Sequence, residues 1–495
     1  MPPRAARALS WLATVGAALV IGGMPFWFAG TGLHAYFTTD DTMNIYGYWT
    51  KPWRDLLAAN LAYYSPFYRP MGGLFYRSVF AVFGFNPFPF RAACFALILV
   101  NLALLYAAAR TLAGSREVGL LTALAGSYHA GFEDLYYNTG MVYDLLCFLF
   151  YVGALLVYSH ARREGRPLGW SNAIGVVTLY ICALNSKEMA VTLPVVTLIY
   201  EWIYHRPKLG RSELLHWISR ELWLVWLLAA MTAPFLLGKL SPASAFAGIP
   251  DYQIHISPAR YLGTYQHYLD CAVYKRAAWF TPAGTLLLWG AMLIVAARSR
   301  RKVLWFSFWF ILVSVLPVIF ITPRGTIAVL YLPYLGWALY AAALLVSVRE
   351  ALAEGLARLA PRLRATGAKM RRLAPAMTFA AAVVFLFPAH QANTFSPQTQ
   401  PMIRSTAEQI HRLLPKLPAN SRILFLEDPF PADDWTLPAV VRLSYGDRTI
   451  AVDRVKRMTG RPDPKEIGSY SVVLTYQGDR LVRVDPARAG GSPAP

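Results

Sequence analysis

The chain has 495 residues, of which 56% are hydrophobic and 15% charged, and its mean hydropathy is +0.38. A soluble domain of this length has no use for so much apolar surface, so the composition excludes an ordinary globular protein and predicts a polytopic membrane protein. The net charge of +20 would suit a nucleic-acid-binding protein, but the basic residues lie in short segments between apolar runs, where they act as topology signals. We therefore expect a lipid bilayer, and no nucleic acid, among the partners.

About eleven apolar stretches approach the roughly 20 residues that a membrane-spanning helix needs. They start near residues Leu9, Arg91, Glu117, Met141, Asn172, Met189, Glu221, Pro282, Val303, Thr326 and Pro375. The basic clusters, such as residues 298–302, lie between alternate pairs of these stretches, on the same side as Arg4 and Arg7. The positive-inside rule then places the N-terminus in the cytoplasm and the C-terminal segment outside.

Residues 31–90 form a long external loop in which two stretches predict helices lying in the membrane interface. Apolar residues recur at helical spacing between Trp53 and Tyr64. The second stretch, residues 69–85, is interrupted by Gly and Pro and is not expected to span the bilayer. Another large external loop covers residues 241–280.

The predicted hairpin around residues 171–194 is unusually short. Only about 14 residues precede Asn185, which at 1.5 Å per residue gives about 21 Å, less than the roughly 30 Å of bilayer hydrocarbon. Lys187 and Glu188 would then lie below the headgroups, where charged side chains face a protein cavity and usually serve function.

Beyond residue 390 the composition becomes mixed. Residues 422–426 predict a strand, residues 471–475 and 481–484 predict a hairpin, and residues 408–417 predict a helix. We expect residues 1–390 to form the membrane domain, residues 391–486 a small external α/β domain, and residues 487–495 a disordered tail.

The acidic pair Asp40-Asp41 follows the first span and should emerge on the external face. A hydroxyl acceptor needs a general base, which a carboxylate can supply. Adjacent hard oxygen donors would also suit Mg²⁺ or Mn²⁺, so a divalent metal is a candidate cofactor. The competing interpretation is that Thr38 and the acids after it only cap a juxtamembrane helix.

Further polar residues occur in other external turns. One turn carries His129, Glu133, Asp134 and Asn138, and the alternative to a base or metal-binding role there is helix capping. Lys187 and Arg324 would suit a phosphate anion. The alternatives are a local ion pair with Glu188 for the lysine and a headgroup contact for the arginine.

These residues lie in segments that resemble the GT-C glycosyltransferases, and most closely the polyprenyl- or dolichyl-phosphate-mannose-dependent O-mannosyltransferases that often carry tetratricopeptide repeats. Residues 186–194 match that group's S-K-E-x-A-x-T-L-P segment at every specified position. His129, Asp134 and the Asp-Leu-Leu run at residues 144–146 match its turn motif, with Asp in place of Glu. The resemblance extends over about residues 38–340.

The chain departs from that pattern at several positions. Ala130 replaces a proline, Met141-Val142 replaces Gly-Arg, and Ala328 stands where an arginine is expected. Arg324, one helical turn earlier, could compensate for the last of these. The tetratricopeptide repeats do not occur in this sequence, so protein recognition of that kind is not implied.

The resemblance implies an all-α, GT-C-like membrane protein with about eleven transmembrane helices, working at the periplasmic face of a bacterial inner membrane. It implies transfer of a sugar, with mannose as one candidate, from a polyprenyl-phosphate donor to a hydroxyl of a protein, lipid or glycan acceptor. Asp40 would be the base, Asp41 would orient it or join Asp134 at a metal, and Lys187 and Arg324 would hold the donor phosphate. His129, Glu133, Asn138 and Glu188 would support them. The alternatives are a transporter or lipid flippase, or a catalytically degenerate scaffold.

Overall fold

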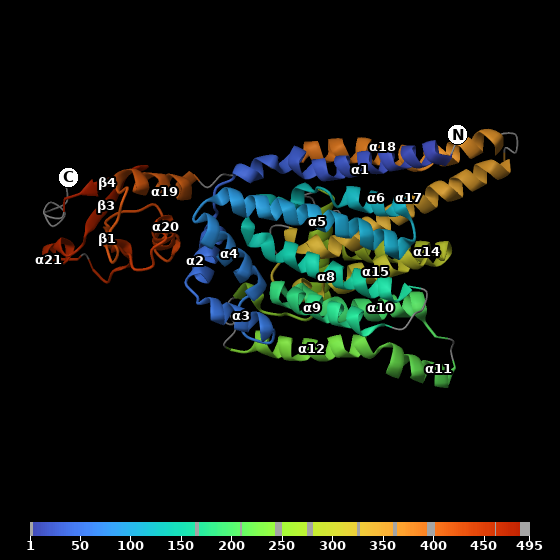
Figure 1. Cartoon of the computed structure of the whole chain (residues 1–495), viewed down its shortest axis with the longest axis horizontal. Coiled ribbons are helices and arrows are strands. Elements are labelled where there is room, and N and C mark those ends of the chain that lie inside the picture. The colour runs from blue at the N-terminus through green and yellow to red at the C-terminus, as the bar shows by residue number, and fades with distance from the viewer. Residues whose placement is uncertain are drawn as a thin grey trace.

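The computed structural model describes residues 3–163, 168–207, 210–242, 250–274, 281–323, 327–359, 364–393, 401–460 and 462–485. Long helices run side by side in a bundle, and a small domain with a sheet lies beyond one end of it (Figure 1). The N-terminus lies at the opposite end of the bundle from this domain. The fold class predicted from the sequence, a helical membrane protein with a small C-terminal α/β unit, is confirmed.

Eight segments in the described part of the chain are long and apolar enough to cross a membrane. They are residues 11–34, 87–113, 139–161, 223–240, 282–299, 302–319, 328–356 and 373–392. The helices within them are α1 (Pro3–Ala29), α5 (Pro87–Ala113), α8 (Val142–Ala161), α12 (Trp223–Leu240), α14 (Pro282–Ser299), α15 (Lys302–Ser314), α17 (Tyr331–Leu359) and α18 (Arg364–Ala392).

The predicted count of eleven spans is not confirmed, because three of the expected segments form shorter helices. They are α6 (Arg116–Ala125), α9 (Trp170–Ser186) and α10 (Leu193–His205). Helix α9 packs along α8, and α6 packs between α5 and α17, so both lie among the long helices. The predicted shortness of the α9 hairpin is therefore reproduced: α9 ends at Ser186, immediately before Lys187.

The first external loop folds into three helices at the end of the bundle nearest the C-terminal domain (Figure 1). They are α2 (Thr39–Trp49), α3 (Trp53–Leu61) and α4 (Pro70–Phe83), and the last two are the helices that the sequence predicted. Helix α4 packs against α2, α3, α8 and α9. Gly72 and Gly73 allow this approach, since a Cβ on Gly72 would meet the Tyr143 ring at 2.1 Å and one on Gly73 would meet Tyr48 at 2.6 Å.

Short helical segments make up most of the other connections. They are η1 (Gly30–His34), η2 (Ala130–Phe132), α7 (Asp134–Tyr137), η3 (Thr139–Met141), η5 (Glu188–Thr192), α11 (Arg211–His216), η6 (Trp217–Glu221), η7 (Pro250–Tyr252), α13 (Pro258–Ala272), α16 (Leu316–Ile319) and η8 (Ala328–Leu330). Backbone hydrogen bonds from His255 to Phe320 and from Thr322 to Asp251 join the loop before α13 to the loop after α16. Two loops far apart in sequence are thus tied together.

The C-terminal residues form a four-stranded sheet in the order β2-β1-β3-β4, with helices packed against it. Its elements are α19 (Pro401–Leu413), β1 (Arg422–Phe425), α20 (Thr436–Tyr445), β2 (Ala451–Arg454), η10 (Val455–Arg457), α21 (Pro464–Gly468), β3 (Val472–Gln477) and β4 (Arg480–Val484). Strands β2, β1 and β3 are parallel, and β3 and β4 form the predicted antiparallel hairpin. The predicted helix at 408–417 starts earlier and ends at Leu413, because Leu414 precedes a proline, which disfavours helical geometry there.

Candidate functional site

Asp41 is fully buried and holds the start of α2 in place. Its carboxylate accepts hydrogen bonds from the Thr38 backbone N–H at 2.8 Å and from the Thr139 hydroxyl, and it pairs with the Arg91 guanidinium at 2.6 Å. Thr38 in turn accepts from the Asp41 N–H, which completes a capping box. The helix-capping interpretation of this acidic pair is therefore confirmed for Asp41, and the same contacts connect α2 to α5 and η3.

Asp40 occupies a different environment although it is the next residue. Its side chain is exposed, and one carboxylate oxygen accepts a hydrogen bond from the Asn138 amide at 3.3 Å. The Asn138 oxygen accepts the Gly140 N–H at 2.7 Å, which fixes the orientation of the amide. Asp40 is thus an exposed carboxylate on a rigid support, and it can accept a proton from a molecule that approaches it.

Tyr68 lies where several external segments meet. Burial raises the pKa of Tyr68 to about 12; the charge of Arg69 lowers it, whereas Tyr252, Glu188 and Asp40 raise it further. These four groups therefore lie close enough to act on a single hydroxyl. They come from the loop of residues 31–90, the connection between α9 and α10, and the loop before α13, so the structure brings these three segments together.

Arg69 forms a nearly buried ion pair with Glu188. Its Nη2 lies 2.7 Å from Glu188 Oε2 and its Nε 3.3 Å from Oε1, which is a bidentate arrangement. The guanidinium also lies over the rings of Tyr68 and Tyr143, 4.8 and 5.0 Å from their centres. Arg69 has a φ of 37°, a left-handed conformation that is strained for a non-glycine residue and that clusters at functional sites.

Two lysines lie in the same region. Lys187 donates from Nζ to Asp144 at 2.5 Å, and both side chains are buried. Lys187 therefore pairs with Asp144 on α8 and not with its neighbour Glu188. Lys239, at the end of α12, donates to the Phe67 carbonyl at 2.5 Å, and its charge acts on Glu188. The three cations, Arg69 included, lie close to the carboxylates of Glu188 and Asp144, and the exposed Asp40 adds a third negative charge beside them.

His129 and the two acids after it occupy the turn before α7. His129 is buried, with Nε2 2.9 Å from the Ala272 carbonyl and its ring stacked 4.3 Å from that of Tyr274. Burial lowers its pKa to about 4, so the ring is neutral. Burial, followed by the charge of Asp134, raises the pKa of Glu133 to about 7. His129 thus joins this turn to the end of α13, while the half-buried Glu133 and Asp134 remain beside the turn surface.

The acids in the described part of the chain do not fit a metal site. No group of three or more His, Cys, Asp or Glu side chains is placed to hold a metal ion among the described residues. The Asp41 carboxylate, which the sequence suggested as a ligand together with Asp134, is already bonded to Thr38, Arg91 and Thr139. Arg324, the predicted partner of Lys187 at the donor phosphate, lies outside the described residues.

Four residues of this site were not predicted from the sequence: Arg69, Lys239, Asp41's partner Arg91, and Tyr68. Arg69 had only a weak signal, because the same loop also contains Lys51, Arg54 and Arg77, and Lys51 likewise precedes a proline. Arg91 sits inside α5, where a charged residue in an apolar run indicates a buried partner. Lys239 resembles an ordinary interfacial lysine at the end of an apolar helix, and only the fold brings it to Glu188.

Part of the chain is similar to a known protein family. Residues 65–236, about a third of the chain, match the model of the dolichyl-phosphate-mannose-protein mannosyltransferase family. The matched segment includes Arg69, Asp134, Asp144 and Lys187. No curated protein sequence matches the chain significantly.

A solved structure of similar fold is the crystal structure of ArnT from Cupriavidus metallidurans bound to undecaprenyl phosphate. The two chains share 14% sequence identity with a TM-score of 0.52, and the alignment covers 98% of this chain and 100% of that one. At this identity the comparison establishes the fold and nothing about the ligand of this chain. The chain is therefore a multi-pass membrane protein with the GT-C fold, and its central segment matches the dolichyl-phosphate-mannose-protein mannosyltransferase family.

Proposed function

We propose that this protein is a membrane glycosyltransferase that moves a sugar from a polyprenyl-phosphate carrier to a hydroxyl acceptor at the periplasmic face of a bacterial inner membrane. The observation that carries the proposal is the exposed carboxylate of Asp40, held beside Tyr68 and the Arg69–Glu188 pair at one end of a GT-C fold. The family match and the undecaprenyl phosphate bound to ArnT support a polyprenyl-phosphate carrier. Mannose is the sugar that the family match favours.

Asp40 is the proposed general base. The acceptor hydroxyl oxygen attacks the anomeric carbon of the donor sugar, its proton passes to Asp40, and the bond from that carbon to the phosphate oxygen breaks with inversion. Asp41 is a positioning residue, because its contacts with Arg91 and Thr139 fix the first turn of α2, from which Asp40 projects. Asp134 and Glu133 are proposed to support the acceptor.

The cations around Glu188 are the proposed donor-phosphate site. The phosphate gains negative charge as the sugar leaves, so cations held in place beforehand stabilise the transition state more than the bound donor. Arg69 and Lys187 would bind phosphate oxygens, with Lys239 adding charge and Arg324 keeping the role expected from the sequence. Arg69 and Lys187 are each paired with a carboxylate, Glu188 and Asp144 respectively, which would exchange for phosphate oxygens when the donor binds.

Transfer from a panel of radiolabelled polyprenyl-phosphate sugars, in membranes carrying the protein, tests this function. We expect one donor to be consumed by the wild-type protein and no detectable transfer by Asp40→Asn. If no donor is consumed, the glycosyltransferase proposal fails, and a transporter or a catalytically degenerate scaffold becomes the better explanation.

Binding of undecaprenyl phosphate to the purified protein tests the phosphate site separately. Arg69→Met keeps the length of the side chain and removes its charge, and should weaken binding about tenfold or more, the loss expected for one charge-assisted bidentate contact. Arg54→Met is the matched control, since Arg54 belongs to the same external loop and is 88% exposed. Equal binding by both variants would remove Arg69 from the donor site.

A further inference from the structure

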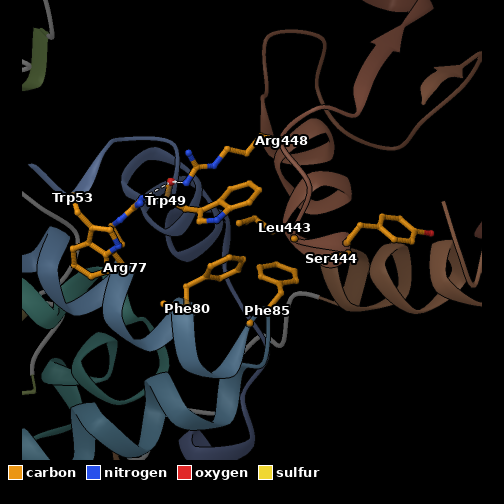
Figure 2. A pocket seen from close by; sticks show the side chains of 12 residues that line it. Trp49, Trp53, Arg77, Phe80, Phe85, Leu443, Ser444 and Arg448 are labelled. Carbon is orange, nitrogen blue, oxygen red and sulfur yellow. Dashed lines mark hydrogen bonds between the residues drawn. The ribbon is translucent and has the colours of Figure 1, made fainter. Parts of the chain in front are cut away.

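A pocket of about 480 Å³ lies between the loop of residues 31–90 and the C-terminal domain (Figure 2), and Asp40 is not among the residues that line it. One wall comes from the end of α2, the start of α3 and the end of α4, and the other from the end of α20 and the residues after it. The side chains that matter for its chemistry are Trp49, Trp53, Arg77, Phe80, Ser444 and Arg448. The pocket therefore exists only while the domain is docked on α2 and α4.

Two arginines give this pocket a positive charge. Arg77 donates to the Trp49 carbonyl at 2.5 Å, and Arg448 donates to the same carbonyl from the opposite wall (Figure 2). The residues that line the pocket in the described part of the chain include no carboxylate. Burial and the charge of Arg448 lower the pKa of Arg77, as expected for two cations facing one cavity. An anion bound between them would relieve this repulsion.

Two buried polar atoms of the lining lack a partner. They are Arg77 Nε and Ser444 Oγ, neither of which is hydrogen-bonded among the described residues. Buried donors are normally satisfied, so these two atoms, one beneath each wall, have hydrogen-bonding capacity that is available to a ligand which displaces the side chains over them.

The remaining surface is aromatic. The Arg448 guanidinium lies 4.7 Å from the centre of the Trp49 ring, and that of Arg77 lies 4.8 Å from the centre of the Trp53 ring. These cation–π contacts hold each indole in a fixed orientation. Flat rings with a few fixed polar groups are typical of a site that binds an organic ring and not a bare ion.

We propose that this pocket binds a saccharide that carries a negative charge, and that this saccharide is part of the acceptor. Trp49 lies nine residues after Asp40 on α2, about 14 Å along the helix axis at 1.5 Å per residue. A saccharide longer than one sugar can therefore have its acidic unit in the pocket and its reacting hydroxyl near Asp40. The acceptor assignment rests on the proposed function, whereas the binding site does not.

Calorimetric titration of the full-length protein in detergent tests the site. The probes are trigalacturonate, glucose 6-phosphate and neutral maltotriose, at matched ionic strength. We expect trigalacturonate, glucose 6-phosphate or both to bind at least tenfold more tightly than maltotriose, and the tighter of the two identifies the carboxylate or the phosphate as the preferred anion.

Three variants locate the binding. Arg448→Gln should weaken binding of the acidic probe about tenfold, and Ser444→Ala should weaken it less without disturbing the domain. Arg457→Gln is the matched control, because Arg457 also stacks on a tryptophan, Trp435, in the same domain but outside the pocket. Arg457→Gln should bind like the wild-type protein.

Equal binding of the acidic and neutral probes, or wild-type binding by both Arg448→Gln and Ser444→Ala, would overturn the proposal and leave the pocket as a packing gap beneath the domain. Binding that follows the predicted pattern in a protein that transfers no sugar would uphold the site and reject only its role as an acceptor subsite.

Discussion

Asp40 and Asp41 show how burial separates the roles of two identical side chains. Asp41 is enclosed by Arg91, Thr139 and the Thr38 backbone, whereas Asp40 is exposed with a single amide contact from Asn138. A fully bonded carboxylate is a poor proton acceptor and a good anchor, while an exposed one is free to meet a substrate. Substitution of Asp41 is therefore expected to lower stability, whereas substitution of Asp40 is expected to lower activity.

Asp41→Asn should destabilise the protein, because it leaves the Arg91 guanidinium buried beside a neutral group. Loss of one partner of a buried pair costs about 3 kcal/mol, so the apparent melting temperature in detergent should fall by several degrees. Asp40→Asn is the control and should change stability by less than about 0.5 kcal/mol, as exposed substitutions do. Equal melting temperatures for the two variants would contradict the anchoring role of Asp41.

Glu133 should make stability depend on pH. Its pKa of about 7 in the folded protein is above its ordinary value of 4.5, so between these values the folded state binds more protons than the unfolded state. Stability then falls as pH rises through this window. Glu133→Gln removes this pH-dependent loss of stability. The melting temperature of the variant minus that of the wild-type protein should therefore increase as pH rises from 5 to 7.5. His129 is present in both proteins, so its contribution to the pH dependence cancels in this difference. A constant difference would refute the raised pKa.

At the scale of single elements, α4 organises the end of the bundle nearest the C-terminal domain. Its two adjacent glycines let α2 and α8 approach closely enough for the Tyr143 hydroxyl to donate to Asn44 at 2.5 Å and to Tyr48 at 3.2 Å. Arg69 directly precedes this helix, and its left-handed backbone is unusual for a residue at the start of a helix and before a proline. The close packing of α4 thus places the ion pair with Glu188.

Gly72→Ala should therefore be destabilising although alanine favours helices. The added methyl group would overlap the Tyr143 ring, and such overpacking costs about 2 kcal/mol, more than the roughly 1 kcal/mol gained in helix propensity. Gly47→Ala in α2 is the matched control, because nothing lies within 4 Å of its new Cβ, and it should be neutral or stabilising. Thermal unfolding of the two variants in detergent measures the difference.

Helices and strands were predicted correctly from the sequence where a local pattern determines them. The predictions failed where tertiary packing determines the length of a helix. Helices α3 and α4, strand β1 and the β3–β4 hairpin follow from apolar spacing and turn residues. The lengths of α6 and α10 do not follow from such patterns, because apolar composition alone cannot distinguish a helix that crosses the bilayer from a shorter one buried between longer neighbours.

At the scale of the whole molecule, the two charged residues at the end of the short hairpin have partners that lie far away in sequence. Glu188 pairs with Arg69 across 119 residues, and Lys187 pairs with Asp144 across 43. The sequence indicated that Lys187 and Glu188 are functional from their depth in the hairpin, yet it could not identify these partners, because motif spacing carries no information on contacts between loops. The pocket between α2, α4 and the C-terminal domain could not be predicted from the sequence either, because it forms only where α20 packs against α2.

The two ends of the bundle should lie on opposite sides of the membrane. Asp479 in the β3–β4 turn and Glu354 near the end of α17 are both exposed. With Cys182 and Cys271 replaced by serine, an impermeant maleimide applied to intact spheroplasts should label Asp479→Cys. It should label Glu354→Cys only after permeabilisation. Labelling of the two variants under the same condition would contradict the proposed topology.

The most direct measurement is single-turnover transfer from the donor that the wild-type protein consumes, comparing Asp40→Asn with Asp40→Glu at equal donor occupancy. If Asp40 is the base, Asp40→Asn should lower the rate at least a thousandfold with undecaprenyl phosphate binding intact, and Asp40→Glu should retain part of it. A wild-type rate for Asp40→Asn would contradict the proposal that Asp40 is the general base, whether or not the pocket beneath the C-terminal domain binds an acidic saccharide.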